Sequence, residues 1–524
     1  MKRIPEQAWI FTGSFVFYLL TLAENFSGPH DSITYLNGIV DGYPLVNQHH
    51  LLYHYAAYCW LHIWQPFIPS VKDYYFIEAF SALWGSLSLA VVYSFFRNRF
   101  HFSGWHATAS ILVVAFSYGF WFYSANIEVY APPLFFILLA LYYLTKKVPG
   151  KSDWWKIIFL HILAILFHQV NVLFVVLVLL KLWQQRKQIS FIHWLSAYTI
   201  CGIAVVGTAY FIVGWIIEQQ NTLSKWYAWM KGYAGGNLYW EALSTKTPVN
   251  MTYGFSHAML GGHYVFQIPP VKRFINASLS SHSLNDELYI ARNISPSMAS
   301  FLLVLTVLLG ILSLWMLIRF FRNFRLINAS YNSIIGPLIF TFILYSAFFT
   351  FWMPEILEFW ILQTVLLWLL LLGALPLISL PFRIKPVYVS VALAFLLFCI
   401  NYFGSMRWMQ HKENDWYYVK TETIQNAAKQ NDLVILQNGW IIKDFLHYFT
   451  KLRVQAVPLN DSSQVQIDSV FSSTLSHKGR VFILPEYKND IRNLDTHYVD
   501  SLRKRYAARL KPFREKEPEM WVIE

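Results

Sequence analysis

The chain has 524 residues and a formal net charge of +12. Hydrophobic residues make up 56% of it and charged residues 13%, whereas soluble domains average roughly 45–50% and 25%. This composition excludes an ordinary soluble globular protein and is typical of a multi-pass membrane protein with belts of aromatic side chains. Nearly half of the charged residues lie after position 405. We therefore expect a membrane domain at residues 1–405 and a water-soluble domain at residues 406–524.

Membrane-spanning helices need about 20 apolar residues each. In chain order, the segments that approach this length are 8–24, 74–96, 106–123, 127–145, 157–183, 193–217, 298–319, 333–353, 357–380 and 386–405. Segment 157–183 has a polar break at residues 168–171, and lysines flank both of its ends. It is therefore predicted to form two short helices, a hairpin with residues 168–171 at its tip. The expected fold is a polytopic α-helical membrane protein with about eleven transmembrane helices.

The distribution of basic residues predicts the orientation of these helices. With the N-terminus in the cytoplasm, sixteen basic residues fall at cytoplasmic helix ends, and one, Lys72, falls in the short outer segments. The positive-inside rule then places the long loops 25–71 and 218–297 and the C-terminal domain on the extracytoplasmic side, with a bacterial inner membrane as the expected location. Because the positive charge lies at helix ends, a nucleic-acid partner is not expected.

The C-terminal region alternates short apolar runs with helical patterns. The expected strands are 432–437, 454–458 and 480–485, and the expected helices are 425–429, 441–450 and 499–510. This alternation predicts a small α/β domain with a mostly parallel sheet. The region has neither a G-x-G-x-x-G motif nor a P-loop, so no nucleotide is assigned to it.

The first outer loop contains two motifs with polar residues. Residues 28–35 read Gly-Pro-His-Asp-Ser-Ile-Thr-Tyr and follow the first span directly, which places Asp31 at the outer membrane surface. Residues 42–53 then supply the adjacent histidines His49 and His50.

Three further segments are expected to contribute polar residues on the outer side. The connection between the third and fourth spans is so short that Glu128 must lie at the membrane edge, close to the first loop. The hairpin tip contributes His168 and Asn171, and the turn between the eighth and ninth spans contributes Glu358. Carboxylates at membrane depth are functional by default.

These motifs resemble the C-superfamily (GT-C) membrane glycosyltransferases, and most closely their protein O-mannosyltransferase-like branch. The resemblance rests on the Asp-bearing loop after the first span and on Glu-Val-Tyr-Ala at 128–131, and it covers roughly residues 8–220 by motif. It implies a polyprenyl-phosphate-linked sugar donor, transfer on the non-cytoplasmic face, and a catalytic role for Asp31. The chain departs from the mannosyltransferase pattern in its α/β tail and in lacking a second acidic residue beside Asp31.

The chemistry of sugar transfer gives these residues roles. A base must take the proton of the acceptor hydroxyl while the lipid phosphate leaves, and we assign this role to Asp31. We assign Glu128 to orienting the acceptor or supporting Asp31. Hydrogen-bond donors and cations are needed for the phosphate. The candidates for binding substrate or lipid phosphate are His49, His50, Tyr130, His168, Asn171, Lys272, Arg273, Arg292 and Glu358. The expected partners are the donor, membrane lipids, and an acceptor protein, lipid or glycan.

Each of these residues also has a structural interpretation. Asp31 can cap a helix that starts at Ser32, and Glu128 can be favoured by a helix dipole. His49, His50 and His54 have the spacing of a helical metal site, which leaves a divalent metal open as a cofactor, although such residues more often pack or contact phosphate. The alternative function is a multi-span transporter or flippase, which basic residues buried in the middle of a span would favour.

The predicted topology can be tested by cysteine accessibility. A cysteine placed at Gly104, at a cytoplasmic helix end, should be protected from an impermeant reagent added outside the cell. A cysteine at Ser462, in the C-terminal domain, should react with it. The opposite labelling pattern would contradict the topology.

Overall fold

The computed structural model describes residues 5–236, 239–278, 285–378, 384–437, 440–457, 464–485, 504–514 and 520–524. Contacts between residues divide the chain into two compact units. Unit 1 comprises residues 1–23, 38–268 and 295–407, and unit 2 comprises residues 24–37, 269–294 and 408–524. Unit 2 therefore combines the C-terminal part of the chain with one segment from each of the two long loops.

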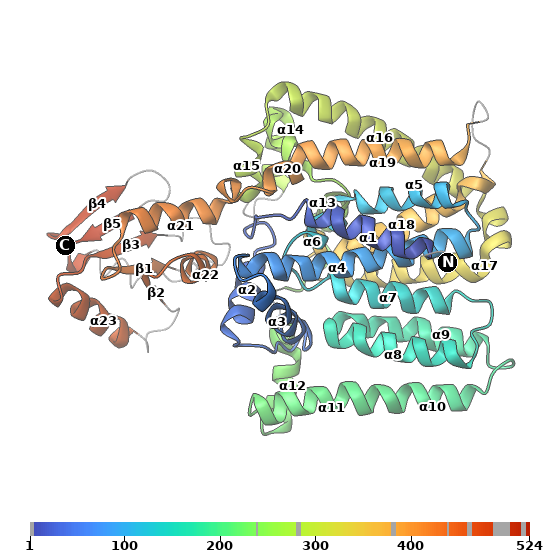
Figure 1. Ribbon diagram of the computed structural model, residues 1–524, viewed down its shortest axis with the longest axis horizontal. Coiled ribbons are helices and arrows are strands. Elements are labelled where there is room, and N and C mark those ends of the chain that lie inside the picture. The colour runs from blue at the N-terminus through green and yellow to red at the C-terminus, as the bar shows by residue number, and fades with distance from the viewer. Residues whose placement is uncertain are drawn as a thin grey trace. The chain divides into compact units, whose positions relative to one another are not determined.

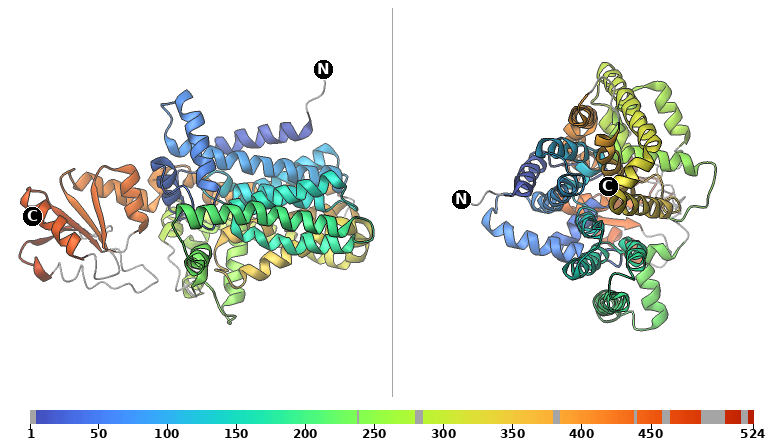
Figure 2. Two further views of the ribbon diagram at one scale, coloured as in Figure 1. Left: turned by 90° about the horizontal axis from the view of Figure 1, so that it is seen from below. Right: turned by 90° about the vertical axis from the view of Figure 1, so that its right-hand side faces the viewer.

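Unit 1 is a bundle of helices, many of which run side by side in Figure 1 and are seen end-on in the right panel of Figure 2. Its helices are α1 (Glu6–Leu19), α3 (Tyr53–Trp64), α4 (Asp73–Ser94), α5 (Gly104–Ala115), α6 (Tyr118–Ser124), α7 (Ala131–Leu144), α8 (Lys151–Phe167), α9 (Val175–Gln184), α10 (Phe191–Gly202), α11 (Thr208–Tyr210), α12 (Leu223–Lys231), α13 (Thr247–Met259), α16 (Pro296–Arg322), α17 (Phe324–Phe349), α18 (Ile361–Ala374) and α19 (Pro386–Asn401). Helix α2 (Ser32–Asp41) crosses the division between the units.

Six helical segments among the described residues are long and apolar enough to cross a membrane. They are Asp73–Arg99, Phe191–Ile217, Pro296–Arg322, Phe324–Phe349, Leu357–Leu377 and Pro386–Met409. The bent pair α5 and α6 gives a seventh if it is counted as one span, and α7 is apolar but shorter. An integral membrane protein is therefore indicated, while the total of about eleven spans stays a prediction.

The third predicted span, 106–123, is formed by two helices with a sharp bend between them, which together are apolar enough to count as one broken span. Helices α5 and α6 meet at an angle of 80°. At the break, the hydroxyl of Ser117 donates to the carbonyl of Val113 (2.9 Å) and accepts from Nε1 of Trp368 (2.9 Å). The hydroxyl thus donates to the carbonyl of Val113, which in a continuous helix would accept a backbone N–H. A hydropathy pattern does not reveal that a side-chain hydroxyl replaces a backbone N–H as the donor.

The predicted break in segment 157–183 is confirmed. Helix α8 ends at Phe167, and His168 is extended with φ of −159°. A 3-10 turn, η3 (Gln169–Phe174), then leads into α9. Figure 1 shows α8 and α9 side by side, as a hairpin requires.

Unit 2 contains a five-stranded sheet in the order β2-β1-β3-β5-β4. Its strands are β1 (Leu433–Gln437), β2 (Arg453–Val457), β3 (Val481–Pro485), β4 (Leu510–Arg514) and β5 (Met520–Ile523), and its helices are α14 (Pro269–Ser278), α15 (Asn285–Ala291), α21 (Trp416–Ala427), α22 (Trp440–Phe449) and α23 (Gln464–Ser476). Strand β1 pairs in parallel with β2 and β3, with Leu433 opposite Arg453 and Val481. Figure 1 shows these strands with α21, α22 and α23.

The three predicted strands are confirmed, but the sheet is mixed because β5 pairs antiparallel with β3 and β4. The expectation of a mostly parallel sheet is therefore correct only for β2-β1-β3. The missed strand β4 reads Leu-Lys-Pro-Phe-Arg and is largely exposed, so it lacks the apolar run of a buried strand. Of the predicted helices, 441–450 matches α22, and 425–429 overlaps the end of the longer α21. Residues 499–503 of the predicted helix 499–510 lie outside the described residues, and the prediction is wrong for 506–510, which form a turn followed by the first residue of β4.

Candidate functional site

Asp31 lies in unit 2 immediately before α2. Its backbone carbonyl accepts the N–H of Tyr35 (2.9 Å) and so begins the helix. Its side-chain Oδ2 accepts a hydrogen bond from the hydroxyl of Tyr35 (3.2 Å). The Asp31 side chain is exposed. The first turn of α2 therefore holds the carboxylate in a fixed orientation while leaving it accessible to a reactant.

The surroundings of Asp31 make it a stronger base than a free aspartate. Although solvent reaches the carboxylate, the protein packed around it raises its pKa, and the negative charge of Asp444 raises the pKa further. The positive charge of His30 and the hydrogen bond from Tyr35 act in the opposite direction. A carboxylate with a raised pKa holds an abstracted proton more firmly, which suits general-base chemistry.

The loop that carries Asp31 is attached to the C-terminal part of the chain by Asp415. This residue is fully buried and caps α21 by accepting the N–H of Tyr418 (2.8 Å). Its Oδ2 also accepts the N–H groups of Phe26 (2.7 Å) and Ser27 (2.9 Å), and its Oδ1 accepts the hydroxyl of Ser27. Burial raises the pKa of Asp415 to about 6, against the opposing effect of these hydrogen bonds. One carboxylate therefore orders both a helix start and the approach to Asp31.

Helix α22 holds the other side of this loop. The hydroxyl of Thr34 donates to Oδ2 of Asp444 (2.5 Å), and Nδ2 of Asn37 donates to the backbone carbonyl of Asp444 (3.0 Å). The ring of Phe26 packs against that of Phe449, at 6.2 Å between centroids. The segments before and after Asp31 are thus both supported by residues beyond position 408.

Glu128 belongs to unit 1 and is buried, with only 1% of its surface exposed. It lies between α6 and α7, where its Oε2 accepts the N–H of Val129 (3.0 Å). Tyr53, from the first loop, lies near it: burial raises the pKa of Tyr53, and the negative charge of Glu128 raises it further. The predicted proximity of Glu128 to the first loop is therefore confirmed.

The first loop also contacts the tip of the α8–α9 hairpin. The backbone N–H of Gln169 donates to the carbonyl of His49 (2.7 Å), and Oε1 of Gln169 lies 3.0 Å from Nδ1 of His49. The ring of His50 lies 5.2 Å from that of His54 and 6.3 Å from that of His168, measured between centroids. The structure thus brings together histidines from two separate sequence motifs.

Burial determines how these loop histidines can act. It lowers the pKa of His49 to about 4 and also lowers the pKa values of His50 and His54. They are therefore neutral near pH 7 and serve as hydrogen-bonding groups rather than as cations. Within the described part of the chain, no three His, Cys, Asp or Glu side chains are arranged to hold a metal ion.

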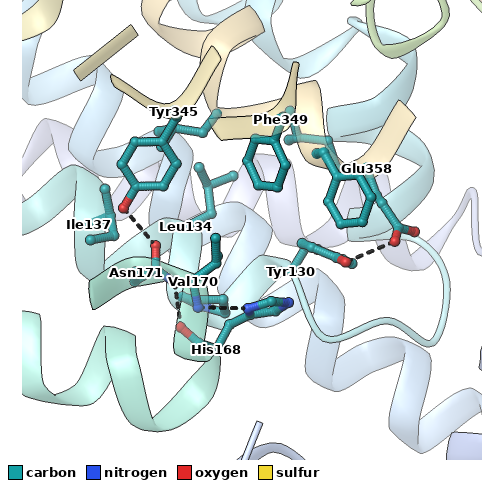
Figure 3. Close-up of a pocket in the computed structure, with 13 residues that line it drawn as sticks. Tyr130, Leu134, Ile137, His168, Val170, Asn171, Tyr345, Phe349 and Glu358 are labelled. Atoms are coloured by element: carbon teal, nitrogen blue, oxygen red, sulfur yellow. Dashed lines mark hydrogen bonds between the residues drawn. The ribbon is translucent and has the colours of Figure 1, made fainter. Parts of the chain in front are cut away.

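A small pocket in unit 1 is lined by Tyr130, His168, Asn171 and Glu358 together with apolar side chains (Figure 3). The ring of His168 lies 5.1 Å from that of Tyr130. The carboxylate of Glu358 accepts hydrogen bonds from the hydroxyls of Tyr130 and Tyr123, each at 2.8 Å. Four residues singled out from three sequence motifs therefore share one pocket.

Asn171 is fixed within this pocket by two neighbours. The hydroxyl of Tyr345 donates to its Oδ1 (3.1 Å), and Nε2 of His161 donates to its backbone carbonyl (2.8 Å). Nδ1 of His161 must then accept, and the hydroxyl of Tyr198 lies 2.7 Å from it. This chain of hydrogen bonds connects the pocket to α10.

The three predicted cationic residues lie in unit 2. Lys272 and Arg273 lie on α14. The guanidinium of Arg292 lies over the ring of Tyr289 at 3.4 Å, and its Nη2 donates to the carbonyl of Glu413 (3.4 Å). The roles of these cations in binding phosphate stay predictions.

Several positions in and around these sites were not assigned from the sequence. Gln169 lies in the polar break at 168–171, and Tyr123 lies in the short segment before Glu128. Their polar side chains among apolar neighbours were the sequence feature that could have identified them. Asp415 had no such signal, because its partner Phe26 lies 389 positions away.

Comparisons with known proteins inform the fold. No protein-family model matches the chain, and no curated protein matches its sequence. The structure is similar to that of ArnT from Cupriavidus metallidurans bound to undecaprenyl phosphate, with a TM-score of 0.53, 8% identity, and coverage of 98% of this chain and 97% of that one. ArnT in the apo state gives a TM-score of 0.48 with 9% identity over the same shares. The first similarity shows that the chain shares its overall fold with this ArnT structure.

The role of Asp415 can be tested with Asp415→Asn. The amide keeps one acceptor oxygen, so it cannot serve both α21 and the Phe26–Ser27 backbone, and at least one buried N–H loses its partner. We expect a loss of about 1–3 kcal/mol in unfolding free energy, and faster hydrogen exchange at residues 24–31. Glu422→Gln, an exposed change on the same helix, is the matched control. Wild-type exchange at residues 24–31 in Asp415→Asn would contradict this role.

Proposed function

We propose that the protein is an integral-membrane glycosyltransferase. It moves a sugar from a polyprenyl-phosphate-linked donor to an acceptor hydroxyl on the extracytoplasmic face of the membrane. The observation that carries the proposal is the exposed carboxylate of Asp31, which has a raised pKa and lies on a loop fixed by buried hydrogen bonds. The polyprenyl-phosphate donor is supported by the similarity in fold to ArnT, whose structure was solved with undecaprenyl phosphate.

The reaction requires one base and one leaving group. Asp31 accepts the proton of the acceptor hydroxyl as its oxygen bonds to the anomeric carbon of the sugar. The bond between that carbon and the phosphate oxygen breaks, and the polyprenyl phosphate leaves with the electron pair. The proton on Asp31 then passes to solvent, to which the side chain is exposed. No redox partner is needed for this balance.

The pocket in unit 1 is assigned to the donor. Leu134, Ile137 and Phe349 form an apolar wall that suits an isoprenoid chain. Tyr130 and His168 supply hydrogen-bonding groups at its polar side, and Glu358 can accept from sugar hydroxyls. The neutral His49 and His50 extend this polar group. Lys272, Arg273 and Arg292 of unit 2 are candidates for binding phosphate by their positive charge.

Glu128 is assigned to orientation rather than to proton transfer. Its carboxylate is buried and engages the backbone of Val129, whereas the Asp31 side chain is exposed. Its negative charge also acts on Tyr53, in the first loop. We infer that Glu128 holds this loop in place for the acceptor.

The base role predicts the behaviour of Asp31→Asn. The amide keeps the size of the side chain and remains a good helix cap, but it cannot accept the proton. Turnover should fall by about 10²–10⁴-fold, with donor-lipid binding little changed. The measurement is steady-state transfer to a native acceptor with equal amounts of folded protein. Activity within about threefold of wild type would remove Asp31 from the mechanism and favour its interpretation as a cap.

Two further variants separate the proposed roles. Asp41→Asn changes an exposed carboxylate at the other end of α2, and it should leave turnover unchanged. Glu128→Gln should reduce turnover less than Asp31→Asn does, because it removes a charge that orients and not the proton acceptor. A larger loss in Glu128→Gln would reverse the assignment of the base.

A further inference from the structure

His30, the residue before Asp31, is held in an unusual backbone conformation. Its φ is +59°, in the left-handed region that non-glycine residues seldom adopt. Its N–H donates to the carbonyl of Ser27 (3.1 Å), and the N–H of Asp31 donates to the carbonyl of Pro29 (2.6 Å). These bonds form a tight turn that fixes His30 and Asp31 relative to each other.

The side chain of His30 pairs with Asp286 of α15, which is 256 positions away. Nε2 of His30 lies 3.2 Å from Oδ2 of Asp286. Asp286 is 8% exposed, and its Oδ1 is buried with no hydrogen-bond partner among the described residues. A buried carboxylate is costly without a compensating charge. His30 is positioned to supply that charge.

The other charges near this pair favour protonation of His30. Although the His30 side chain is partly exposed, the protein packed around it opposes a positive charge. The hydrogen bond to Asp286 and the charges of Asp286, Glu287 and Asp31 outweigh this effect and raise the pKa of His30 to about 9. Burial, with the charge of Asp286, raises the pKa of Glu287 to about 7. His30 therefore carries a positive charge at neutral pH and lies next to the proposed base.

Two more carboxylates belong to the charges around the turn, and Lys443 and His447 act on one of them, Asp444. Asp444, on α22, acts on Asp31 and raises its pKa. The negative charge of Asp286 also raises the pKa of Asp415, at the start of α21. The positive charge of His30 lowers the pKa of Asp31, whereas burial and the negative charge of Asp444 raise it.

We propose that Asp286 and His30 are positioning residues for the transfer reaction: Asp286 holds His30 as an imidazolium beside Asp31, and this positive charge keeps Asp31 in the ionised form that accepts the acceptor's proton. This inference rests on the proposed function of Asp31 as the base. Neither residue touches the substrate in this assignment. Together they set the pKa of Asp31. Burial raises this pKa and makes the carboxylate a stronger base, and the positive charge lowers it and keeps the carboxylate deprotonated.

The first test is the pH dependence of kcat/KM in full-length protein. His30→Asn removes the charge and still tolerates the left-handed conformation, and Asp286→Asn removes the group that holds the charge. In both variants the pKa of Asp31 should rise, so the acidic limb of the profile should move upward by roughly one pH unit. His30→Lys retains a positive charge and should bring the limb back towards wild type. A merely structural pair would lower the rate at all pH values without moving the limb, which would overturn the proposal.

A second test does not depend on activity. Diethyl pyrocarbonate modifies neutral imidazole, and the side chain of His30 is 42% exposed, so modification of its peptide can be followed by mass spectrometry against pH. Half-maximal modification should fall near pH 9 in the wild type and move down towards about 6.5, the ordinary histidine value, in Asp286→Asn. Ordinary behaviour of His30 in the wild type would overturn the pairing. The expected labelling together with an active Asp31→Asn would instead refute the proposed base, and with it the positioning role.

Discussion

The fold around Asp31 depends on the buried carboxylate of Asp415, whose oxygens are shared between the first turn of α21 and the backbone of Phe26 and Ser27. A carboxylate taken out of water needs donors from the protein, and here two elements separated by 389 positions supply them. Movement of either element would leave a buried charge or buried N–H groups without partners. The loop before Asp31 is therefore as well ordered as the helix that anchors it.

This constraint gives the C-terminal part of the chain a structural role that its sequence does not reveal. Asp415 holds the loop before Asp31, and Asp444 on α22 holds the first turns of α2 through Thr34 and Asn37. A proton acceptor needs a defined position, and residues on rigid elements provide it better than residues on free loops. We infer that the α/β region beyond residue 408 supports the proposed base.

The sequence predicted the features that depend on local patterns and missed those that depend on distant partners. Apolar runs indicated the long helices and the three parallel strands, and the polar residues at 168–171 indicated the broken hairpin. Placing the short loops on one side of the membrane put His168, Tyr130 and Glu358 on that side, but their meeting in one pocket was not predicted. The 80° bend near Ser117 was missed because it depends on side-chain hydrogen bonds. Asp286 was missed because only the folded chain brings it to His30.

A density map of the protein with bound undecaprenyl phosphate can test whether Asp31 is the base in sugar transfer from a lipid phosphate. We expect density for a lipid phosphate in a groove that opens sideways to the membrane, with the Asp31 carboxylate facing the phosphate end. A continuous pore without a lateral opening, and no phosphate density beside Asp31, would rule out this role and favour a transporter.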